Sequence, residues 1–89
     1  TAFISAAGVT LEQGLTTSRS GLADALNAAA GASARTIGLL DSTKFKRASL
    51  LTVRSAQSLD MLITDDGLDS ETVEEFRNAG VNLVIAGQK

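Results

Sequence analysis

The sequence predicts an α/β domain with a mostly parallel, Rossmann-like sheet flanked by helices. Short apolar segments that suit buried strands alternate with segments of helical spacing. At residues 59–86 a strand, a helix and a strand follow one another with short connections, and such a crossover pairs its strands in parallel. The chain has 89 residues, 44 % of them apolar, which suffices for one small domain with a modest core.

Five segments are expected to form strands because they are short and apolar or rich in β-branched residues. They are residues 2–7, 36–40, 48–53, 59–64 and 81–86. Residues 9–20 contain a glycine and several hydroxyl side chains, so we expect a loop there.

Two segments are expected to form helices. Residues 21–34 are rich in alanine and have leucines at helical spacing, although Gly31 costs about 1 kcal/mol relative to alanine. Residues 69–79 have apolar side chains on one side, Asp69 at the start and Gly80 directly after the end. Asp suits the positive N-terminus of a helix and Gly suits its C-terminal stop, so this second helix has both of its boundary signals.

Composition excludes several classes of function. The chain has no Cys and no His, so it cannot build a disulfide framework, a thiolate zinc site or a histidine general base. Its net charge of −2 does not favour nucleic acid, so we expect any contact with DNA to come from a segment outside this chain. No apolar run approaches the ~20 residues that span a bilayer, and we expect a cytoplasmic protein without a membrane partner.

The first candidate binding site follows the predicted strand at residues 36–40. Ligands of open parallel sheets bind outside the carboxyl ends of the strands, and here Asp41, Ser42, Thr43 and Lys44 come directly after one. These side chains suit an anionic or polyhydroxylated ligand, with the Lys44 ammonium as the charge for a phosphate. The alternative is an ordinary turn, in which Asp41 caps backbone amides and Lys44 is solvated.

The second candidate is the stretch that contains Gly14, Thr16 and Thr17. A glycine lets backbone N–H groups approach an anion, and the two hydroxyls add hydrogen-bond donors. An ordinary polar loop is again the alternative.

An acidic cluster around the predicted strand at 59–64 is a third possibility, for a metal ion. It consists of Asp60, Asp65, Asp66 and Asp69. The spacing does not match a calcium loop, and turn and N-cap roles account for the last three residues. We therefore expect neither a metal nor another cofactor.

Three stretches, taken in order, resemble the C-terminal sensor domain of DeoR-family repressors. The family carries AFI-x-A-x-G followed by E-x-GLTT, then LLADSSKF, then ID-x-LITD. The corresponding stretches here are AFISAAGV at 2–9 with EQGLTT at 12–17, LLDSTKF at 39–45 and DMLITD at 60–65. Each is short, but their order and spacing hold across nearly the whole chain.

The resemblance implies a fold similar to ribose-5-phosphate isomerase and a sensor that binds a phosphorylated sugar or a related metabolite. Residues 1–89 would then be the C-terminal part of this effector domain. Because such a part of a domain exposes sheet edge or core surface, we expect homo-oligomers. The first part of the sensor domain and an N-terminal helix-turn-helix, which binds DNA, would lie outside the chain. The ligand-binding role passes to the positions that match the family pattern: Thr16, Thr17, Asp41, Ser42 and Lys44.

One departure from the family pattern keeps alternatives open. Leu22 and Leu26 lie near positions where the family usually has charged residues, which leaves open a less charged ligand or the absence of a ligand. In the latter case the domain serves only for oligomerisation. A sugar-phosphate isomerase is a weaker alternative, because catalysis by proton transfer needs carboxylates around the glycine loop, and none occurs between Gly14 and Asp24. We therefore expect a transcription regulator and not an enzyme.

Overall fold

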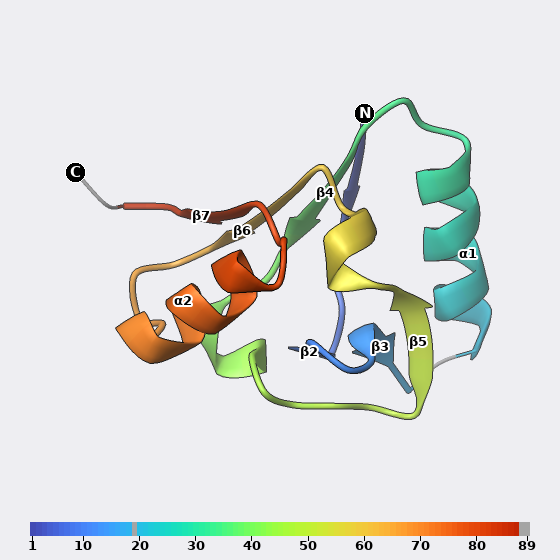
Figure 1. Ribbon diagram of the computed structural model, residues 1–89. Helices are drawn as coiled ribbons and strands as arrows, with labels where there is room; N and C mark the ends of the chain where they lie inside the picture. The colour runs from blue at the N-terminus through green and yellow to red at the C-terminus, as the bar shows by residue number, and fades with distance from the viewer. Residues whose placement is uncertain (19, 88–89) are drawn as a thin grey trace.

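The computed structural model describes residues 1–18 and 20–87, and its elements are shown in Figure 1. The chain alternates short strands with two α-helices (α1, α2) and two single-turn 3-10 helices (η1, η2). In order they are β1 (Ala2–Ile4), β2 (Gly8–Thr10), β3 (Gly14–Thr17), α1 (Ser20–Gly31), β4 (Thr36–Leu39), η1 (Ser42–Lys44), β5 (Leu51–Arg54), η2 (Ala56–Ser58), β6 (Met61–Thr64), α2 (Ser70–Asn78) and β7 (Leu83–Ile85).

The parallel sheet that the sequence predicts is present. It has four strands in the order β1-β4-β6-β7, and every neighbouring pair is parallel. The crossover predicted at residues 59–86 is confirmed as β6-α2-β7. Each of these strands is shorter than the apolar segment that predicts it.

The expectation of a loop at residues 9–20 is wrong. Gly8–Thr10 and Gly14–Thr17 are strands β2 and β3, and β3 pairs with both β2 and β5 in a separate antiparallel sheet of order β2-β3-β5. Gly14 has φ of 74°, which a glycine adopts without strain, and this lets the chain turn back between β2 and β3. The β-branched threonines then fit a buried strand. The strand expected at 48–53 lies at Leu51–Arg54 and belongs to this second sheet, so only part of the β-structure is parallel.

The two helices cover different parts of the molecule. α1 contacts β1, β3 and β5, and in Figure 1 it lies at the right, beside the antiparallel sheet. It ends at Gly31, earlier than the expected boundary at residue 34, because glycine weakens the last turn. α2 contacts β7 and begins where the sequence predicts: Asp69 accepts hydrogen bonds from the backbone N–H (3.1 Å) and the hydroxyl (2.8 Å) of Thr72. Gly80, with φ of 93°, follows its end.

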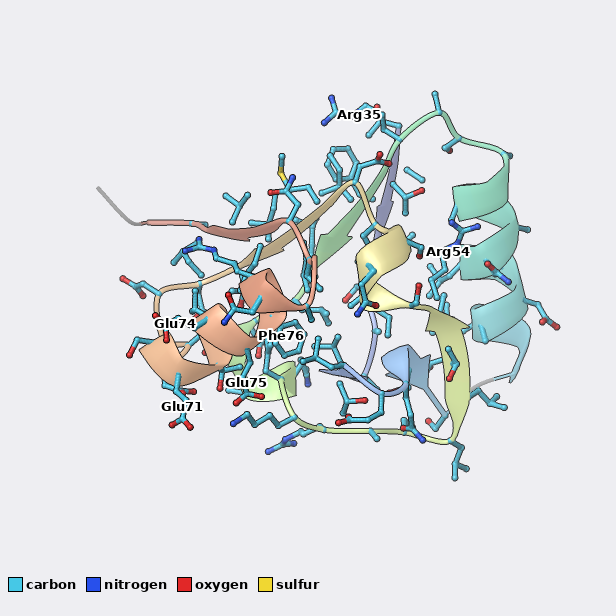
Figure 2. The ribbon with its side chains drawn as sticks, in the orientation of Figure 1. Arg35, Arg54, Glu71, Glu74, Glu75 and Phe76 are labelled. Atoms are coloured by element: carbon cyan, nitrogen blue, oxygen red, sulfur yellow. The ribbon has the colours of Figure 1, made fainter. Side chains whose placement is uncertain are left out.

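The core lies between α2, the parallel sheet and the antiparallel sheet. Its largest fully buried side chains include Phe76 of α2, Leu15 of β3 and Leu62 of β6. Figure 2 shows Phe76 on the inner side of α2, away from the three labelled glutamates of that helix. Its ring meets that of Phe45 edge to face, with centroids 5.0 Å apart, and this contact fixes the segment that follows β4.

The other face of the parallel sheet is open. The paired positions Phe3, Ile37 and Met61 share this face because directly paired residues of parallel strands point to the same side. Phe3 is 62 % exposed, and Leu39, two residues along β4 from Ile37, is 42 % exposed. Parallel sheets are normally covered on both faces, so this apolar surface is unusual for a parallel sheet. Among the described residues, no helix is both long enough and apolar enough to cross a membrane.

Candidate functional site

A cavity of about 400 Å³ lies at the carboxyl edge of the parallel sheet. We call it the carboxyl-edge cavity. Leu39, Leu40 and Ile63 supply much of its apolar wall. Its polar lining consists of Ser5, Asp41, Lys44, Thr64 and Asp65, which follow or end β1, β4 and β6. This is where ligands bind in open parallel sheets, so the first candidate site of the sequence is located at a real hollow.

The segment from Asp41 to Lys44 has an internally fixed backbone. Asp41 caps η1, and its Oδ1 accepts hydrogen bonds from the Thr43 backbone N–H (3.0 Å) and from the Thr43 hydroxyl. Lys44 N–H donates to the Asp41 carbonyl at 3.1 Å. The turn that we weighed as the alternative is therefore present, and it places Lys44 in the cavity wall.

Asp65 ties the loop after β6 to the loop after β4. Its carboxylate accepts hydrogen bonds from the backbone N–H of Ser42 (2.9 Å) and of Gly67 (2.8 Å). The bond from the Ser42 backbone contributes most to lowering the pKa of Asp65, with help from Gly67 and from the Ser42 hydroxyl. A Cβ at Gly67 would lie 2.7 Å from Ser42 Oγ and 2.8 Å from Asp65 Oδ1, so a side chain there would require these two side chains to move.

Lys44 supplies a positively charged side chain to the lining of this cavity. It is half-buried, and within residues 1–18 and 20–87 it takes part in no ion pair. By contrast, Nζ of the nearby Lys46 lies 3.8 Å from Oε1 of Glu75 of α2, and both of these side chains are largely exposed. An ammonium in a cavity wall without a carboxylate partner is available to a ligand anion or to ligand hydroxyls.

The second candidate site is arranged differently. Gly14 and Thr16 are buried and lie outside the carboxyl-edge cavity. The Thr16 hydroxyl donates to the Gly8 carbonyl (3.3 Å) and accepts from the Ser49 backbone N–H (2.8 Å). A Cβ at Gly14 would lie 2.1 Å from the Arg54 carbonyl oxygen, so the missing side chain allows close backbone packing. In the structure, these two residues therefore contribute to packing and hydrogen bonding within the fold.

Thr17 borders a second hollow of about 380 Å³, which we call the helix-side cavity. Leu22 and Leu26 of α1 line it, so the two leucines that depart from the family pattern form an apolar wall. Ser5 lines both cavities, which makes the two hollows neighbours along β1. The structure therefore brings Asp41 and Lys44 together in one cavity and places Thr17 at another.

The acidic residues hold the backbone in place. Asp60 Oδ2 accepts from the Thr36 backbone N–H at 2.7 Å, and Asp69 caps α2. The pKa of Asp69 is lowered, first by the Thr72 hydroxyl and then by the Thr72 backbone N–H. In the described part of the chain, no three side chains of the metal-binding types gather closely enough to hold a metal ion.

Thr64 and Ser5 are cavity-lining residues that are not among the site residues predicted from the sequence. Both follow the rule that found Asp41, since each lies at the carboxyl end of a parallel strand. Thr64 stands within the DMLITD stretch, and its polar side chain at the end of an otherwise apolar strand was the available signal.

Comparison with known proteins defines the class of this domain. The family model described as the DeoR C terminal sensor domain matches residues 1–66. A putative aga operon transcriptional repressor of Escherichia coli O157:H7 is 31 % identical over 86 residues, which cover 97 % of this chain and 32 % of the relative. The HTH-type transcriptional regulator GolR of Listeria innocua serovar 6a is 32 % identical over 84 residues, covering 94 % of this chain and 33 % of the relative.

The class is therefore a sensor domain of the kind found in transcription regulators. The chain belongs to the DeoR family and corresponds to its C-terminal sensor domain. It spans about a third of the length of the two regulators that it matches.

Proposed function

We propose that this chain is the effector-binding part of a DeoR-type transcriptional repressor. A phosphorylated sugar binds in the carboxyl-edge cavity and changes the affinity for DNA of a separate helix-turn-helix segment. Residues 1–89 form the C-terminal part of the sensor domain in this proposal, and the protein acts in the cytoplasm. Membership of the DeoR family and the names of the two regulators support the regulatory role.

The observation that carries the proposal is Lys44, which lines the carboxyl-edge cavity and forms no ion pair among residues 1–18 and 20–87. Asp41 and Asp65 share that wall, and bonds from nearby amides and hydroxyls occupy both carboxylates. Carboxylates accept hydrogen bonds from sugar hydroxyls, and a lysine pairs with a phosphate. Apolar walls with a few convergent polar groups are typical of small-molecule sites.

The test is the thermal unfolding of the intact polypeptide with ribose 5-phosphate, fructose 6-phosphate and glucose 6-phosphate, each with its unphosphorylated sugar. A ligand that binds only the folded state adds about 2.7 kcal/mol at a hundredfold excess over its Kd. For an intact sensor domain of about 150–250 residues that is a rise in Tm of roughly 5–10 °C.

Lys44→Ala is expected to abolish most of that rise while leaving the unliganded Tm within about 2 °C, since exposed or half-exposed surface changes cost little. Lys46→Ala is the matched control, because Lys46 does not line this cavity. If Lys44→Ala retained the full rise in Tm, the phosphate would not bind at this site.

The cavity does not suit proton-transfer catalysis. A general acid or base working near neutral pH needs a pKa near that value, whereas the pKa of Asp65 is lowered below its usual acidic range. Asp41 is engaged as a cap. We therefore propose a regulator without isomerase activity. When ribose 5-phosphate is incubated with the protein, the NMR spectrum of the sugar phosphate should show no conversion to another sugar phosphate.

A second function, assembly, is favoured by the exposed apolar surface. Phe3 and Leu39 lie on the open face of the parallel sheet, and Leu22 is 43 % exposed on α1. Exposed apolar surface of this kind promotes association. We propose that the protein forms homo-oligomers, so sedimentation of the intact polypeptide should show a dimer or larger species. A strictly monomeric species at micromolar concentration would contradict this.

A further inference from the structure

We infer that the helix-side cavity is a second subsite for the effector and that it holds an apolar end of the ligand, while the phosphate binds at Lys44. The effector is then a sugar phosphate that has a methyl group in place of a hydroxymethyl group at the end away from its phosphate. The inference rests on the proposed function, because it adds a subsite to the cavity that we propose for the sugar phosphate.

The two cavities meet at the carboxyl end of β1. Ser5 directly follows β1, is exposed, and lines both of them. Their volumes of about 400 and 380 Å³ each lie near the lower end of the range of roughly 300–1,000 Å³ that is usual for small-molecule sites. A ligand that lies across Ser5 therefore reaches both cavities at the edge of the sheet where such ligands bind.

The helix-side cavity has apolar walls that are open to solvent. Leu22 and Leu26 are four residues apart in α1, so they lie on the same side of the helix. Leu22 is 43 % exposed and Leu26 is half-buried. Ala6 and Ala7 also line the cavity, and neither is fully buried. A ligand can therefore contact these side chains directly from solvent.

The two cavities differ in charge. Asp41, Lys44 and Asp65 line the carboxyl-edge cavity, whereas the described residues that line the helix-side cavity have only aliphatic and hydroxyl side chains. A charged ligand group against these aliphatic walls would lose water without gaining a partner, and a methyl group would gain from leaving water. The charged end of the ligand thus belongs at Lys44 and the apolar end at Leu22 and Leu26.

The shape of the surface favours a small ligand over a second copy of the chain at this position. Leu22 lies in the wall of a hollow that adjoins the proposed phosphate site, whereas Phe3 and Leu39 lie on the open face of the sheet. Assembly through the sheet face therefore leaves the helix-side cavity available to the effector.

Matched pairs of sugar phosphates test the subsite. Fructose 1-phosphate and 6-deoxyfructose 1-phosphate differ only at the carbon farthest from the phosphate, and glucose 1-phosphate and 6-deoxyglucose 1-phosphate differ in the same way. We expect calorimetric titration of the intact polypeptide to show that the 6-deoxy compound of at least one pair binds about tenfold more tightly than its partner, the scale of one small group in an apolar pocket.

Leu22→Gln should remove most of this preference, because it replaces the apolar wall by an amide. The change is at an exposed helix position, so the unliganded Tm should stay within about 2 °C of the wild type. Leu50→Gln is the matched control and should keep the preference, since Leu50 is 86 % exposed and lines neither cavity. Lys44→Ala should weaken both members of a pair alike.

The outcomes separate the subsite from the proposed function. If the members of each pair bind the wild type equally, or if only other sugar phosphates bind, the apolar subsite is overturned and the proposed function stands. A preference that a folded Leu22→Gln keeps in full also overturns the subsite, and altered sedimentation of that variant would then assign Leu22 to assembly. If no sugar phosphate binds the wild type, both the proposed function and this inference fall.

Discussion

Two stretches of this chain look alike in sequence and behave differently in the fold. The segment from Asp41 to Lys44 and the segment from Gly14 to Thr17 both combine small or hydroxyl-bearing residues close to a strand. In the structure, the first follows a parallel strand and places Lys44 at a cavity, whereas the second is itself a strand whose Thr16 hydroxyl is bonded within the fold. Polar residue types indicate that a segment is able to bind a ligand. Whether their hydrogen-bonding groups are already bonded within the fold depends on the sheet that the segment joins.

The largest expected effect comes from filling the space at Gly14. In Gly14→Ala, the added Cβ would lie 2.1 Å from the Arg54 carbonyl oxygen, at a φ of +74° that disfavours side chains. Together the left-handed conformation and the overpacking should lower the free energy of unfolding by about 3 kcal/mol or more. Denaturant unfolding measures this loss.

Gly31→Ala is the matched control for Gly14→Ala. Nothing lies within 4 Å of a Cβ at Gly31, which ends α1, so alanine there should be neutral or stabilising by up to about 1 kcal/mol. If Gly14→Ala were equally harmless, β3 could not pack closely against the segment after β5. A ligand-binding loop at Gly14 would then be the better interpretation.

A smaller effect is expected from the two buried threonines, and it distinguishes the two regions directly. Thr16→Val leaves the Ser49 N–H and the Gly8 carbonyl without their partner, which should cost about 1–3 kcal/mol of unfolding free energy. Thr64→Val removes a hydroxyl that has no partner in the described chain, so it should cost nothing or stabilise slightly. Chemical unfolding of both variants without ligand gives the comparison, and equal losses would contradict it.

Much of the fold could be predicted from the sequence because its signals are local. The β6-α2-β7 crossover follows from the hydrophobic periodicity and the lengths of its three segments. The start of α2 follows from Asp69, whose carboxylate accepts a hydrogen bond from the Thr72 N–H as expected of an N-cap. The strands β2 and β3 could not be predicted in the same way. Glycine and threonine are common in both loops and strands, and β3 is stabilised by β5, which lies far along the chain.

The candidate site was predictable in part. The rule that ligands bind at the carboxyl ends of parallel strands located Asp41 and Lys44, because it needs only the order of the strands. The same rule applied to β6 would have added Thr64. It could not show that the Thr16 hydroxyl is bonded within the fold, because that depends on a hydrogen bond to Ser49, which is 33 residues away.

The sequence by itself determined the class of fold, the helix boundaries at Asp69 and Gly80, and the resemblance to the DeoR sensor domain, since each rests on residue types at fixed spacing. Only the tertiary structure decided which polar groups are occupied and which are free. A hydroxyl has the same chemistry at Thr16 and at Thr64, but its partners come from distant backbone segments. The Thr16 hydroxyl meets Gly8 and Ser49, whereas the Thr64 hydroxyl meets no partner among the described residues.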